Sequence, residues 1–110
     1  MGYAKIEDQK KLKQPLNIEK IVHFFQKNNW KVKVFENRVE ADYGSSILWN
    51  LFGDAGLTKS LGDPMMALVE VEERSIKIKL ESKIWTWGGK HARVSKRLRE
   101  VLQNFWEEIE

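Results

Sequence analysis

Residues 66–80 read MALVEVEERSIKIKL, and this stretch decides the fold. On both sides of positions 73–74, apolar residues alternate with charged ones, most clearly in the run IKIK at 76–79. A period of two is typical of a strand that buries one face and exposes the other. Two such runs joined by a short polar pair predict a β-hairpin, whose second strand continues to Trp87.

The same pattern occurs earlier in the chain. Residues 30–35 read WKVKVF and residues 38–43 read RVEADY, with Glu36-Asn37 between them. This predicts a second hairpin. In each hairpin, one strand carries lysines and the other carries acids on the polar side. We therefore expect a solvated sheet face with cross-strand ion pairs, each worth about 0.2–1 kcal/mol.

Two segments show the period of an amphipathic helix. Asn17 is a favourable N-cap, and apolar residues follow at positions 18, 21, 22 and 25, so we expect a helix that ends near Asn28-Asn29. A longer helix is predicted from about Lys90 to Glu108. Its apolar stripe is wide enough to face a core and consists of Val94, Leu98, Val101, Leu102, Phe105 and Ile109.

A short helix is also predicted between the hairpins, because a serine at 45 or 46 precedes the apolar run ILWNLF and Gly53 follows it. The element order is then α-ββ-α-ββ-α. This order predicts an α+β two-layer sandwich, in which helices cover one face of a four-stranded antiparallel sheet. Residues 1–16 have no broad apolar face, so they are expected to be a flexible polar arm, and residues 17–110 a single domain.

The composition limits the possible functions. The chain has 110 residues, 42% of them hydrophobic and 32% charged, and it has no cysteine, which excludes disulfides and thiolate chemistry. No apolar run is long enough to span a membrane, and a secretory signal is not visible, so a cytoplasmic location is expected. The Lys/Glu-rich composition is compatible with a heat-adapted source. His23 and His91 lie on different predicted elements, and no pair of carboxylates is placed for acid–base catalysis. We therefore expect no cofactor, no metal and no enzyme activity.

The segment WTWGGKHARVSKRLR, residues 85–99, is the strongest functional signal. Positions 90–99 contain five basic residues and no acid, whereas positions 100–110 contain four glutamates. This order opposes the helix dipole, and two glycines leave the helix start without a side-chain cap. The pattern predicts a site for nucleic acid or another anionic partner, formed by Trp85, Trp87, Gly88, Gly89, Lys90, Arg93, Lys96 and Arg97.

Other interpretations remain open at this stage. The segment can instead be a strand-to-helix turn followed by an ordinary solvated helix face. Alternatively, the chain is a homo-oligomerising interaction domain, in which the opposed charges of the last helix pair antiparallel in a homodimer. Residues 45–64 can be a plug of the core, an interface or a lid over a small apolar ligand. In the interface case, the apolar anchor is formed by Leu48, Trp49, Leu51 and Phe52.

Overall fold

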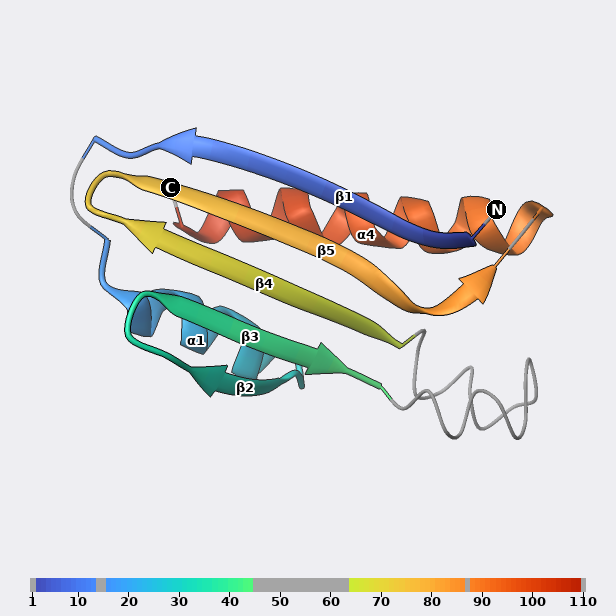
Figure 1. The fold of residues 1–110 in the computed structure, drawn as a ribbon, viewed down its shortest axis with the longest axis horizontal. Helices are drawn as coiled ribbons and strands as arrows, with labels where there is room; N and C mark the ends of the chain where they lie inside the picture. Colours follow the sequence, from blue (N-terminus) through green and yellow to red (C-terminus); the bar gives the residue numbers. More distant parts are fainter. Residues whose placement is uncertain (1, 14–15, 45–63, 87, 110) are drawn as a thin grey trace.

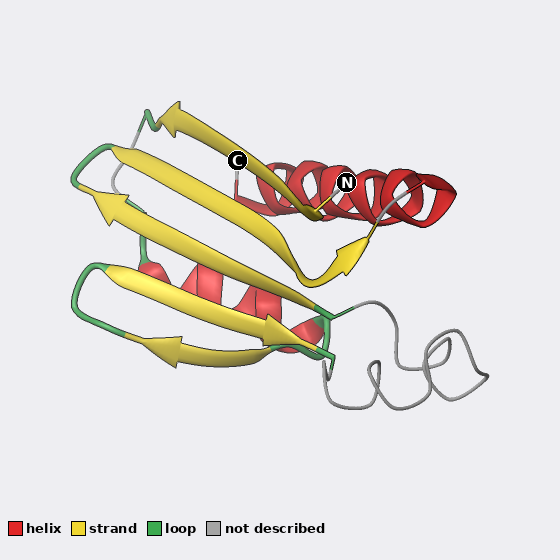
Figure 2. Cartoon of the chain, turned by 45° about the vertical axis from the view of Figure 1, so that its right-hand side comes forward, coloured by secondary structure: helices red, strands yellow, loops and turns green. Residues whose placement is uncertain are grey.

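The computed structural model describes residues 2–13, 16–44, 64–86 and 88–109, apart from the side chains of residues 84–86 (Figure 1). Their elements have an α+β arrangement, with five antiparallel strands in the order β1-β5-β4-β3-β2. Both described helices lie on the same face of this sheet, as Figure 2 shows. The elements are β1 (Gly2–Lys11), α1 (Ile18–Lys27), β2 (Lys31–Val34), β3 (Arg38–Tyr43), β4 (Met65–Glu72), β5 (Ser75–Thr86) and α4 (Gly88–Ile109).

Both predicted hairpins are present. Strands β4 and β5 pair from Glu72 opposite Ser75 onward, and β2 and β3 pair from Val34 opposite Val39. The alternation in the sequence sets the two faces of the sheet. In β5, for example, Ile76, Ile78 and Leu80 are buried under the helices, whereas Lys77 is exposed on the other face.

The first strand corrects the prediction for the start of the chain. Residues 2–11 are not a flexible arm: they form β1, which pairs antiparallel with β5 from Gly2 opposite Thr86 to Lys11 opposite Ser75. The predicted four-stranded sheet therefore has a fifth strand. The prediction was wrong because β1 carries Asp8 and Lys10 on the same face as the half-buried Ile6, so its inner face has no continuous apolar pattern. The predicted helix at 46–52 lies outside the described residues.

The first helix follows its predicted boundaries closely. The side chain of Asn17 accepts a hydrogen bond from the backbone N–H of Glu19 over 3.0 Å, which caps the first turn. At the other end Asn29 adopts a φ of 70°, the left-handed conformation that asparagine tolerates better than most residues. The helix buries Ile21, Phe24 and Phe25 and packs over β2 and β3.

The second described helix, α4, packs over β1 and β5 and extends along the long axis of the molecule (Figure 1). Its 22 residues correspond to a length of about 33 Å. The predicted apolar stripe is buried except for Leu102, which is half-buried. Phe105 joins the two helices, because its ring lies 5.4 Å from that of Phe24 and 6.0 Å from that of Phe25.

Candidate anion-binding surface

The turn between β5 and α4 depends on one glycine. Gly88 has a φ of +64°, which a side chain would disfavour, whereas no left-handed angle is found at Gly89. A Cβ added at either position would meet no atom within 4 Å. The glycines are therefore not required for packing, and only Gly88 is required for backbone geometry. The first turn of α4 contains no acidic residue.

The basic residues of α4 lie on its surface, around a buried stripe that includes Val94 and Leu98. Lys90 is half-buried. The other four are exposed, and we refer to them as the α4 basic surface: Arg93, Lys96, Arg97 and Arg99.

Arg97 of this surface forms an ion pair with Glu100. The Nη1 atom of Arg97 lies 3.8 Å from a carboxylate oxygen of Glu100, one helical turn away, and both side chains are half exposed. A pair of this kind contributes less than about 1 kcal/mol in water. Its weak attraction leaves Arg97 able to exchange Glu100 for an external anion.

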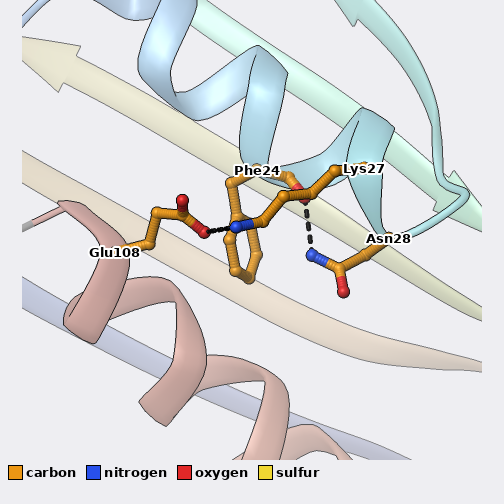
Figure 3. A network of polar contacts seen from close by, with 4 residues as sticks. All are labelled: Phe24, Lys27, Asn28 and Glu108. Atoms are coloured by element: carbon orange, nitrogen blue, oxygen red, sulfur yellow. Dashed lines mark hydrogen bonds and ion pairs between the residues drawn. The ribbon is translucent and has the colours of Figure 1, made fainter.

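The second half of α4 holds the acids, and one of them has a partner in the other helix. Glu108 forms an ion pair with Lys27 of α1, as Figure 3 shows. Lys27 stands in the last turn of α1, where a cation is favourable, and Glu108 stands in the last turn of α4, where an anion is not. The reversed charge order at this end of α4 is thus partly compensated inside the chain.

The predictions for the two tryptophans and for the apolar anchor are not tested by the described side chains. The backbone of Trp85 lies in β5 opposite Tyr3, but the side chain of Trp85 is not described. The register between Tyr3 and Lys5 shifts, because these two residues face Trp85 and Glu81. Other predicted residues lie outside the described part of the chain: Trp87, Leu48, Trp49, Leu51 and Phe52.

A groove that the sequence did not predict lies between β1 and α4. It has a volume of about 450 Å³, and its lining combines apolar side chains with Lys10 and Arg99. The indole N–H of Trp106 donates to the Asp8 carboxylate over 3.0 Å, and the ammonium of Lys10 lies 4.9 Å from the centre of the Trp106 ring. We call this the β1–α4 groove, lined by Ile6, Lys10, Arg99, Leu102, Gln103, Trp106 and Glu107.

The opposite face of the sheet carries a smaller hollow of about 320 Å³ around Met66 and Leu68. Its rim carries charges of both signs, which include Lys79 and Glu81. Lys79 lies 3.8 Å from Glu7 of β1, in the register that places these two residues opposite each other. This face is therefore a mixed-charge surface, whereas the first half of α4 carries a single sign of charge.

Neither described helix is long and apolar enough to cross a membrane. Among the residues that the structure describes, no cluster of three or more histidine, aspartate or glutamate side chains is placed to hold a metal ion. No protein-family model, no curated protein and no solved structure matches this chain.

Proposed function

We propose that this chain is a non-enzymatic binding module that holds an anionic partner on the α4 basic surface, and that the partner is single-stranded nucleic acid. The observation that carries the proposal is the exposure of four cationic side chains within seven successive residues of one helix, Arg93 to Arg99, with no acid among them. Side chains of this kind bind phosphates through charge-assisted hydrogen bonds.

The position of this surface supports the proposal. The ring contacts and the ion pair between the two helices involve Phe105 and Glu108, in the second half of α4. The first half of α4 continues well beyond α1 (Figure 1). An extended ligand can therefore approach the α4 basic surface along the helix without meeting α1. The partial positive charge of the helix start adds to the attraction.

The charge distribution favours a short or flexible ligand over a long duplex. Glu107 and Glu108 follow the basic surface on the same helix, within three turns of Arg97. A rigid duplex laid along α4 would bring its phosphates close to these carboxylates. A single strand can bend away after its contacts with the basic side chains, and its binding needs few base-edge contacts.

The test is a titration of a fluorescent single-stranded oligonucleotide over a salt series, with the intact chain. Each phosphate contact should contribute about −0.7 to the slope of log K against log salt. The variant Arg93→Gln/Arg97→Gln should weaken binding and make this slope shallower by about 1.4.

The matched control is Lys31→Gln/Lys33→Gln, which removes the same charge from the exposed lysines of β2, at the far edge of the sheet. This variant should keep the slope and the affinity of the wild type. Equal losses in the two variants would show that net charge alone drives binding, and an affinity that does not change with salt would exclude a phosphate-binding surface.

A further inference from the structure

Strand β1 leaves one of its two edges without a partner strand in the described sheet, where it is the terminal strand. The backbone N–H of Leu12 donates to the carbonyl of Arg74 over 2.7 Å. This bond shows which residues of β1 direct their backbone groups toward β5 and which direct them away from it. In the regular part of β1, the even-numbered residues turn their N–H and C=O groups toward β5, and the odd-numbered residues turn theirs toward the outer edge. The outward groups belong to Lys5, Glu7, Gln9 and Lys11.

We propose that this edge pairs antiparallel with β1 of a second copy of the chain, with the two-fold axis at Ile6. In this register Lys5 stands opposite Glu7 of the second copy, and Glu7 stands opposite its Lys5. Two opposite-charge pairs then flank a pair of isoleucines. Because Lys5 and Glu7 carry outward backbone groups, both pairs are also hydrogen-bonded pairs of the joined sheet.

Neighbouring registers are less favourable. An axis at Glu7 would place two Glu7 side chains opposite each other, and an axis at Asp8 would do the same with two aspartates, which is repulsive. An axis at Gln9 gives attractive pairs, such as Glu7 with Lys11, but it places Lys5 opposite Lys13. It also moves the centre of the dimer about 10 Å along the strand, since each residue rises about 3.3 Å.

The direction and charge order of α4 favour the axis at Ile6. Helix α4 runs in the same direction as β1, so two copies would bring their α4 helices together antiparallel (Figure 1). Ile6 lines the β1–α4 groove together with Leu102, near the middle of the charge gradient. An axis there faces the basic part of one helix, at Arg99, with the acidic part of the other, at Glu107. An axis at Gln9, near Trp106, would carry Arg99 beyond the end of the other helix.

The distance between the two α4 helices in this dimer also suits direct helix packing. Helix α4 packs over both β1 and β5. Strands are separated by about 4.8 Å, so joining two sheets at β1 places the two α4 axes about two strand spacings apart, or roughly 10 Å. Packed helices lie about 8–10 Å apart. The two copies of the β1–α4 groove would then face each other, and the half-buried side chains of Ile6 and Leu102 would cover their counterparts.

This interface shares Arg99 with the α4 basic surface, but Arg93 and Arg97, the two residues changed in the oligonucleotide titration, lie away from it. At about 100° per residue, Arg93 and Arg97 lie roughly 120° and 160° around α4 from Arg99, which lines the groove. Both arginines therefore remain accessible in the dimer, and the oligonucleotide titration and the dimer test are independent of each other.

The test is disulfide trapping combined with sedimentation of the unmodified chain. The chain has no cysteine, so a single one can be introduced at a chosen position. Ile6→Cys would place two cysteines opposite each other in a non-hydrogen-bonded pair, with Cα atoms about 4.5 Å apart. This separation lies within the range that a disulfide bridges, about 4.4–6.8 Å. Mild oxidation should therefore yield a covalent dimer of Ile6→Cys.

Gln9→Cys is the matched control, since its two cysteines would stand about 20 Å apart in the proposed register. It should yield no covalent dimer under the same oxidation, while circular dichroism checks that both variants are folded. Wild-type chain should show a reversible dimer in sedimentation, and Ile6→Lys should weaken it by at least about tenfold, because two ammonium groups would meet on the axis. A strict monomer at high concentration, or trapping at Gln9 equal to that at Ile6, would overturn the proposal.

Discussion

The indole N–H of Trp106 donates to the carboxylate of Asp8 over 3.0 Å, and this bond joins α4 to the edge strand of the sheet. The two residues are 98 positions apart in the chain. Only 6% of Trp106 is exposed, so its N–H group needs an acceptor within the protein. Asp8 supplies this acceptor from the face of β1 that the helix covers, where a strand ordinarily carries an apolar side chain.

We expect Asp8→Ala to destabilise the fold by about 1–3 kcal/mol, because the buried indole N–H would lose its acceptor. Asp8→Asn keeps an acceptor oxygen and should cost less than half as much. Urea unfolding followed by circular dichroism measures both values. Glu7→Ala serves as the control, since its ion pair with Lys79 is exposed and worth less than about 1 kcal/mol. Equal losses for the two Asp8 variants would mean that the hydrogen bond is not what Asp8 contributes.

Deletion of residues 1–12 should abolish cooperative unfolding. It removes β1, which pairs with β5 over its whole length and covers one side of Trp106. The loss in the free energy of unfolding should approach the roughly 5–15 kcal/mol that is typical of a whole small domain. Calorimetry of the truncated chain checks this. A retained, sharp transition near the wild-type temperature would show that β1 is dispensable, as expected for a flexible arm.

The hairpins could be predicted from the sequence because each strand places apolar residues on one face and charged residues on the other. In β5, for example, Ile76 and Ile78 alternate with Lys77 and Lys79. Strand β1 could not, since its inner face changes from Ala4 and Ile6 to Asp8 and Lys10. An edge strand is held largely by backbone pairing on one side, which leaves little trace in the side-chain pattern. The polar inner positions are tolerated because Trp106 contacts both Asp8 and Lys10.

The candidate site was predictable only in part. The charge order of α4 can be read from the sequence, and the exposure of Arg93, Lys96 and Arg97 agrees with it. The ion pair between Glu108 and Lys27 could not be predicted, because it depends on how two helices distant in sequence pack on the sheet.

Gly88→Ala and Gly89→Ala should have opposite effects on stability. Gly88 has a φ of +64°, so alanine there should cost about 1 kcal/mol. At Gly89, alanine meets no neighbour within 4 Å and favours the helix, with an expected gain of about 0.5 kcal/mol. Thermal unfolding of both variants gives the comparison. Destabilisation by Gly89→Ala would indicate that the helix start needs two glycines for its geometry.

Glu108 and Lys27 form an ion pair, and replacing one of them should change the free energy of unfolding more than replacing the other. Lys27→Gln leaves the Glu108 carboxylate in the last turn of α4 without its cation, and we expect a loss of about 0.5–1 kcal/mol. Glu108→Gln removes the ion pair together with an unfavourable helix-end charge, so the two effects offset each other and the change should stay within about 0.3 kcal/mol.

The double variant Lys27→Gln/Glu108→Gln should then resemble Glu108→Gln rather than the sum of the single losses. Urea unfolding at low salt measures this cycle. In about 1 M salt, where the Debye length falls to roughly 3 Å, the difference between the single variants should shrink because both side chains are partly exposed. If Glu108→Gln instead costs as much as Lys27→Gln, the attraction between the pair outweighs the dipole. The Glu108 carboxylate would then stabilise the fold despite its unfavourable position at the end of α4.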